Sequence, residues 1–144
     1  MTLIPSFPGV ELVLRALGCW PAFHDAEVIR FSLARGATPE ANQSDLELDV
    51  QIREYETRHE GTAQYELVQI KNVLIEFSFA GVEGVQVEDF NFHNVIDSLT
   101  LDNEVSDGGE RIRVQVESIY GFGAAWLCRS AKVKDVCHLA IKVS

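Results

Sequence analysis

The feature that constrains the fold most is the alternation of apolar and polar residues across residues 45–53. Successive side chains of a β-strand point to opposite faces of a sheet, so this pattern predicts a strand with one buried and one wet face. The apolar face comprises Leu46, Leu48, Val50 and Ile52. A strand of this kind is typical of an antiparallel sheet, because parallel sheets are covered on both faces.

A second clean alternation covers residues 111–117, and turn signals separate further extended stretches. These stretches are residues 20–35, 64–79 with a bulge or turn at Lys71–Asn72, 85–90, 95–101, 124–129 and 136–143. The Gly108–Gly109 pair predicts a hairpin reversal, and the Gly121-Phe122-Gly123 run predicts a strand break. We therefore expect one mainly β domain over residues 1–144, folded as an antiparallel curled sheet or a sandwich.

One short helix is predicted near the N-terminus, at roughly residues 7–17. Its apolar stripe, at helical spacing, is formed by Val10, Val13, Leu14 and Leu17. Ser6 is the candidate N-cap, Pro8 is tolerated in the first turn, and Gly18 is the expected stop signal. Two polar or charged stretches are expected to form exposed connections: residues 36–44 and residues 54–61.

The acidic composition limits the partners that the chain can take. Asp and Glu number 22 against 12 Lys and Arg, which gives a net charge of -10. Such a field repels nucleic acid and anionic membranes and attracts a basic partner. An acidic surface that serves solubility alone would have the same composition.

The cellular setting is predicted from what the sequence does not contain. No apolar run approaches the roughly 18 residues of a membrane span, and no signal peptide is recognisable at the N-terminus. The three cysteines lack Cys-x-x-Cys spacing, so reduced thiols in a cytoplasmic protein are expected. Cys128 shares the strand phase of Ala124 and Trp126, which predicts a buried structural thiol.

No catalytic motif is present in the sequence: there is no Gly-x-Ser-x-Gly, no phosphate-binding glycine loop and no His-Glu-x-x-His. Accordingly, no catalytic residue, metal or cofactor is predicted. One alternative is a metal-dependent hydrolase that uses His24, Asp25, Glu27 and His93. Another is a small-molecule binding module whose pocket is lined by Phe77, Phe79, Phe90, Phe92, Phe122 and Trp126, although these residues could equally fill a core.

Two carboxylates, Asp25 and Glu27, fall on the apolar face of the predicted strand at residues 20–35. Burying each without a partner would cost several kcal/mol. Either the strand enters the core only after Glu27, or the two acids have dedicated hydrogen-bond donors. The same alternation places His24 on the face opposite to both acids.

The segment Trp-Pro-Ala-Phe-His-Asp-Ala-Glu-Val at residues 20–28 resembles the opening signature of bacterial immunity proteins of the immunity protein 50 type, from polymorphic toxin systems. Residues 73–77, 89–96 and 120–128 are also similar to that family. The signature positions are Trp20, Phe23, His24, Asp25 and Glu27. The resemblance implies a non-enzymatic, mainly β protein that binds and neutralises a cognate toxin.

Two acidic clusters are candidate partner-binding residues. The first, on the polar face of residues 45–53, comprises Asp45, Glu47 and Asp49. The second, on the predicted hairpin loop, comprises Asp102, Glu104, Asp107 and Glu110. Either cluster would attract a basic toxin, and an ordinary solvated surface is the alternative. A homodimer is also expected, because an exposed edge strand invites pairing with a second copy.

Overall fold

The structure, a computed structural model, describes residues 5–35, 44–106 and 109–141. Its elements are α1 (Val10–Leu17), β1 (Glu27–Arg35), β2 (Ser44–Arg58), β3 (Glu66–Ala80), β4 (Glu83–Glu88), β5 (Val95–Ser106), β6 (Gly109–Tyr120), β7 (Gly123–Cys128) and β8 (Ser130–His138). They form one antiparallel sheet of order β4-β7-β6-β5-β1-β2-β3-β8, which confirms the predicted mainly β fold with one short N-terminal helix. Within the described ranges, no helix reaches the length and apolarity of a membrane span.

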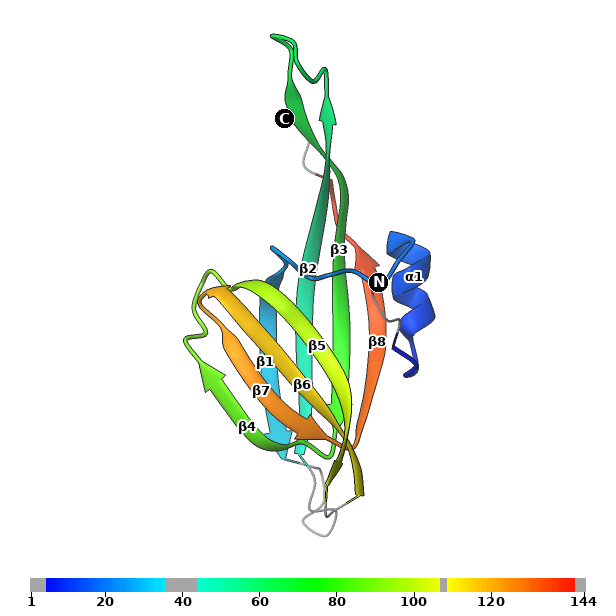
Figure 1. Cartoon of the computed structure of the whole chain (residues 1–144), viewed down its shortest axis with the longest axis vertical. Coiled ribbons are helices and arrows are strands. Elements are labelled where there is room, and N and C mark those ends of the chain that lie inside the picture. The colour runs from blue at the N-terminus through cyan, green and yellow to red at the C-terminus, as the bar shows by residue number, and fades with distance from the viewer. Residues whose placement is uncertain (1–4, 36–43, 107–108, 142–144) are drawn as a thin grey trace.

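The sheet curls into two layers, and its two halves are joined at a narrow junction. Between β1 and β5 the register holds a single pair, Glu27 opposite Val95. In Figure 1 the half β4-β7-β6-β5 lies in front of the half β1-β2-β3-β8 and crosses it at an angle. Aromatic rings meet between the layers, with centroids of Phe79 and Trp126 5.1 Å apart. The core therefore lies between the two halves of one sheet.

Four of the six aromatic residues that could have lined a pocket fill this core instead. Those with side chains that are almost completely buried are Phe77, Phe79, Phe122 and Trp126. Phe90 and Phe92 are exposed. The predicted apolar face of β2 is also buried, as is Cys128, and burial raises the pKa of its thiol to about 12. Because the thiolate is the reactive form, Cys128 is a structural residue.

Helix α1 packs against β8 at one side of the sheet (Figure 1). It is shorter than predicted, and its N-cap is Gly9 with φ of 89°, so the prediction of Ser6 as N-cap is wrong. The reason is close packing: the backbone N–H of Val133 donates to the carbonyl of Pro8 at 2.9 Å. A Cβ at position 9 would lie 2.1 Å from the carbonyl oxygen of Val133. The predicted stop at Gly18 is confirmed.

Three strand predictions are wrong at their boundaries. The second acidic cluster was expected on a loop at residues 102–110, but β5 continues to Ser106 and β6 begins at Gly109. The strand expected from about Phe23, after a turn at Trp20–Pro21, begins only at Glu27, because Phe23 and Asp25 have φ of 64° and 66° and interrupt the extended backbone. The last strand lies at Ser130–His138 instead of residues 136–143, since Ala131 and Val133 already alternate into the core. The hairpin reversal before β6 and the break before β7 are confirmed by the strand pairings.

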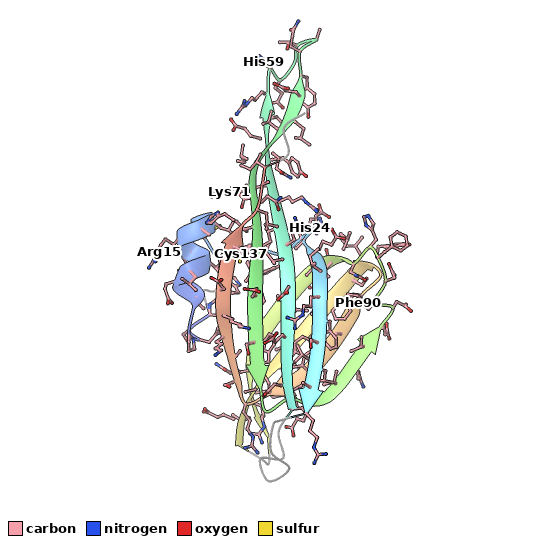
Figure 2. The ribbon with its side chains drawn as sticks, turned by 180° about the vertical axis from the view of Figure 1, so that it is seen from behind. Arg15, His24, His59, Lys71, Phe90 and Cys137 are labelled. Carbon is pink, nitrogen blue, oxygen red and sulfur yellow. The ribbon has the colours of Figure 1, made fainter. Side chains whose placement is uncertain are left out.

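The hairpin of β2 and β3 extends beyond the rest of the sheet. Residues 54–61 were expected to be a connection, but β2 continues to Arg58, paired with Glu66. The predicted bulge lies at Ile70, one residue earlier than expected. Residues 55–69, the projecting end, pair only with each other among the described residues, and Figure 2 shows His59 at the tip. Of the predicted connection at residues 36–44, all but the last residue lie outside the described residues.

Candidate functional site

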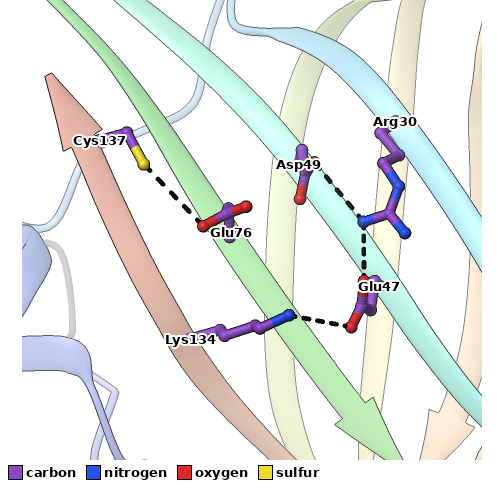
Figure 3. Close-up of polar contacts among 6 residues, drawn as sticks. All are labelled: Arg30, Glu47, Asp49, Glu76, Lys134 and Cys137. Carbon is purple, nitrogen blue, oxygen red and sulfur yellow. Dashed lines mark hydrogen bonds and ion pairs between the residues drawn. The ribbon is translucent and has the colours of Figure 1, made fainter. Parts of the chain in front are cut away.

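Two cations, one from β1 and one from β8, lie beside the first acidic cluster on the outer face of β1-β2-β3-β8 (Figure 3). The Glu47 carboxylate accepts hydrogen bonds from Arg30 of β1 at 2.7 Å and from Lys134 of β8 at 3.3 Å. Asp49 lies 3.8 Å from the same Arg30 guanidinium. Asp45 is exposed. The predicted row of three carboxylates is therefore partly neutralised by two cations.

The two inner carboxylates of this cluster respond oppositely to their surroundings. The hydrogen bonds from Arg30 and Lys134 hold the pKa of Glu47 below its ordinary value. Asp49 has only 7% of its surface exposed, and this burial raises its pKa. The expectation that Asp49 lies on a fully wet face is thus wrong, because the long Arg30 side chain of β1 lies beside its carboxylate.

A second polar group lies farther along the same face. Glu76, Asp135 and Cys137 each offer one ligand atom, and these atoms lie within 4.8 Å of one another. The Cys137 thiol points to Asp135 at 3.7 Å and to Glu76 at 4.0 Å. Burial and then the neighbouring carboxylates raise the pKa of this thiol. Since a thiol ligates metal only after losing its proton, the raised pKa works against a metal at this group.

The second acidic cluster lies along the hairpin of β5 and β6. Glu104 accepts two hydrogen bonds from the Arg113 guanidinium, at 2.5 and 3.2 Å, and they lower the pKa of its carboxyl. Asp102 and Glu110 are exposed. Asp107 lies outside the described residues. The hairpin therefore presents two exposed acids beside one that is internally paired.

The histidine group proposed for hydrolysis is not assembled. His24 Nδ1 lies 2.9 Å from an Asp97 oxygen, and its Nε2 lies 3.6 Å from Asp25. Glu27 instead pairs with Arg53 at 3.5 Å, and the ring of His93 contacts Phe92 and Tyr120. Among residues 5–35, 44–106 and 109–141, the three-ligand group at Glu76 is the only one with metal-binding spacing. Both explanations for the acids of this segment hold in part: Asp25 precedes the strand, and Glu27 has a donor.

Comparison with known protein families identifies the family of this chain. A family model described as immunity protein 50 matches residues 9–138. The chain belongs to the immunity protein 50 family. The matched range runs from the N-cap of α1 to the last residue of β8, so the family model covers the whole observed fold. Comparison with curated proteins and with solved structures finds no significant match.

In this immunity protein 50 family member, the signature comprises a buried aromatic pair and polar residues at the surface. Trp20 and Phe23 are buried and in ring contact, with centroids 5.6 Å apart. Both also contact Phe77, which ties the link between α1 and β1 to the core. His24 and Asp25 remain exposed beside it. The aromatic part of the signature therefore builds the fold.

A surface that the sequence predictions missed follows β4. Residues 89–94, the aromatic loop, expose Phe92 almost completely. Sequence reasoning placed this phenylalanine in a core or pocket because it treated apolar residues as interior. The neighbouring asparagines Asn91 and Asn94 were the available signal, since asparagine favours turns in which side chains hydrogen-bond to nearby backbone.

Proposed function

We propose that this chain is a non-enzymatic immunity protein that binds a cognate toxin domain in the cytoplasm and neutralises it. The observation that carries the proposal is the family match over residues 9–138. An immunity protein acts by occupying a surface of its toxin, so it needs a stable scaffold and a complementary face. The curled sheet and its surface charges supply candidates for both.

Electrostatic attraction is the first contribution that we propose. The net charge of -10 favours a basic toxin and disfavours nucleic acid or anionic membrane as the partner. The binding residues would come from the two acidic clusters, Asp45, Glu47, Asp49, Asp102, Glu104, Asp107 and Glu110. Because Glu47 and Glu104 are internally paired, the exposed members Asp45, Asp102 and Glu110 would contribute most of the attraction.

The experiment is protection of cells. The candidate toxin domain is sought among the genes next to the one that encodes this chain. It is expressed with this chain, with an empty vector, or with an unrelated acidic protein of similar size. Only this chain should restore growth, and the two purified proteins should form a complex in light scattering. Growth arrest despite abundant folded chain, with no complex formed, would contradict the proposal.

Charge steering has its own test, on Asp45→Asn, Asp102→Asn and Glu110→Gln combined. None of these three acids forms an ion pair with a described residue, so folding should be unchanged. The association rate at low salt should fall roughly tenfold, and its salt dependence should flatten. An unchanged rate would place the steering charges elsewhere.

Self-association belongs to the same proposal. The sheet edges are β4 and β8, and α1 packs against β8. Strand β4 is then the edge available for pairing with a second copy. A monomeric mass in sedimentation at micromolar concentration would contradict a homodimer.

A further inference from the structure

Phe92 is the most exposed large apolar side chain of the described residues, with 87% of its surface accessible. The His93 ring contacts it edge-on at 5.9 Å between centroids and contacts the exposed Tyr120 at 6.4 Å. Single exposed apolar residues are common on protein surfaces, so exposure alone indicates little. Phe92 is distinguished by the backbone that holds it.

The aromatic loop is fixed by two asparagine side chains. Asn94, with 3% of its surface exposed, accepts from the Asn91 backbone N–H at 2.9 Å and donates to the Asn91 carbonyl at 2.6 Å. Its amide also donates to the Val28 carbonyl of β1 at 3.3 Å. Asn91 in turn donates to the Asp89 carbonyl and accepts from the His93 N–H, both at 2.9 Å. Phe92 therefore lies between two residues whose backbone is held on both sides.

The turn between β6 and β7 supports the loop from a second direction. Gly121 has φ of 82°, and a Cβ there would lie 2.4 Å from the His93 carbonyl oxygen. The backbone of the turn thus lies directly against the loop. A loop already ordered in the free protein loses little conformational entropy on binding, and a rigid aromatic side chain is the kind of group that forms interface hot spots.

The charges around the loop indicate what kind of surface it would meet. From Asn72 to Glu110 the chain contains no Lys or Arg, a range that includes β4, the aromatic loop and β5. Glu88 and Asp89, immediately before the phenylalanines, are both exposed. An apolar tip with acidic neighbours is complementary to an apolar pocket edged by lysine or arginine.

We propose that the aromatic loop is the anchor of the toxin interface, with Phe92 inserted into an apolar pocket of a basic toxin and Tyr120 packed beside it. This inference rests on the proposed function and adds a location to it. The acidic clusters accelerate the encounter, whereas the aromatic loop determines how long the complex lasts.

The test is Phe92→Ala, whose binding to the purified toxin domain identified by the protection experiment is measured by surface plasmon resonance. The dissociation constant should rise at least tenfold, mainly through faster dissociation. The matched control is Leu67→Ala, another exposed apolar residue, with 59% of its surface accessible, in the projecting end and outside both acidic clusters. Its dissociation constant should stay within twofold of the wild type, and both variants should melt at the wild-type temperature.

The outcomes separate this inference from the function on which it rests. If the wild-type chain binds no toxin, the proposed function fails. If the wild-type chain binds and Phe92→Ala binds equally well, only the anchor is wrong. If Phe92→Ala converts a dimer of the free chain to monomers without weakening toxin binding, the loop serves self-association and the inference is overturned.

Asn91→Ala tests the rigidity of the loop with the phenyl ring retained. The variant loses the hydrogen bonds to Asp89 and His93, while Asn94 still binds the loop backbone. Toxin affinity should fall three- to tenfold, because a mobile loop must become ordered on binding. An affinity equal to the wild type would mean that a pre-formed loop is not required, which would overturn the anchoring argument.

Discussion

The body and the projecting end of the β2–β3 hairpin share the same two strands and the same antiparallel pairing, with a one-residue register shift at the bulge between them, but they differ in what covers them. In the body, Leu48 opposes Phe77 and Val50 opposes Ile75, and all four side chains are completely buried. In the projecting end, Thr57 opposes Leu67, and both are exposed. Backbone pairing thus continues well past the point where burial stops.

This difference shows that strand formation and stability have separate sources in the hairpin. Ladder hydrogen bonds and cross-strand pairs can extend a ribbon, but a two-stranded ribbon alone is marginally stable in water. The body is stabilised by burial against the front half of the sheet and by ion pairs on its outer face. Substitutions in the two ends should therefore differ greatly in effect.

The largest effect is expected for Phe77→Ala in the body. Its ring is completely buried and contacts Trp20, Phe23 and Phe79. The unfolding free energy should fall by about 3–5 kcal/mol, from lost burial and the cavity that remains. Denaturant titration gives this value directly. A loss below about 1 kcal/mol would mean that the body is not the stable part of the hairpin.

An intermediate effect is expected for Glu47→Gln on the outer face of the body. The lost charge-assisted hydrogen bonds should lower stability at pH 7 by about 1 kcal/mol. Because the folded-state pKa of Glu47 is lowered, its stabilisation is present above the unfolded pKa and disappears as the pH falls through the folded value. The difference between variant and wild type should therefore shrink between pH 6 and pH 3.

The control for that measurement is Glu56→Gln, an exposed acid in the projecting end. Thermal melts of both variants across the same pH range should show a pH-dependent difference for Glu47 alone. Equal pH dependence in the two variants would indicate that the ion pairs of the face contribute nothing specific. The buried Asp49 opposes the trend, since its raised pKa makes its protonation at low pH favourable.

The smallest effect is expected for Leu67→Ala in the projecting end. Its side chain is 59% exposed, so truncation removes little buried surface. The unfolding free energy should change by less than about 0.5 kcal/mol. Hydrogen exchange should likewise be fast in residues 55–67 and slow in the body. A loss similar to that of Phe77→Ala would show that the whole hairpin is one cooperative unit.

The sequence predicted those parts of the fold that depend on neighbouring residues. Alternation at residues 45–53 located the body of β2, and glycine signals located two of the turns. The left-handed backbone at Phe23 and Asp25 was not predictable, because neither residue type requires it. The alternation at Ala131 and Val133 covers too few residues to indicate the start of β8 by itself.

The candidate site depended on contacts that no local pattern records. Glu47 meets Arg30 and Lys134, which are 17 and 87 positions away along the chain, so the pairs depend on strand order. Phe92 looked like an interior residue because exposure of an aromatic side chain is decided by the loop that carries it. Whether the partner-binding residues lie in the acidic clusters stays a prediction.

The contact between α1 and β8 joins the first described element to the last, so during synthesis it can form only after nearly all of the fold has been made. A growing chain releases α1 early, but its docking surface exists only after residues 130–138 have been synthesised. At roughly 5–20 residues per second, the interval is on the order of ten seconds. Once β3 has been synthesised, it pairs with β2 alone until β8 follows. The fold is therefore completed only after β8 has been synthesised, and under the proposed function protection would depend on chains that were finished before the toxin arrived.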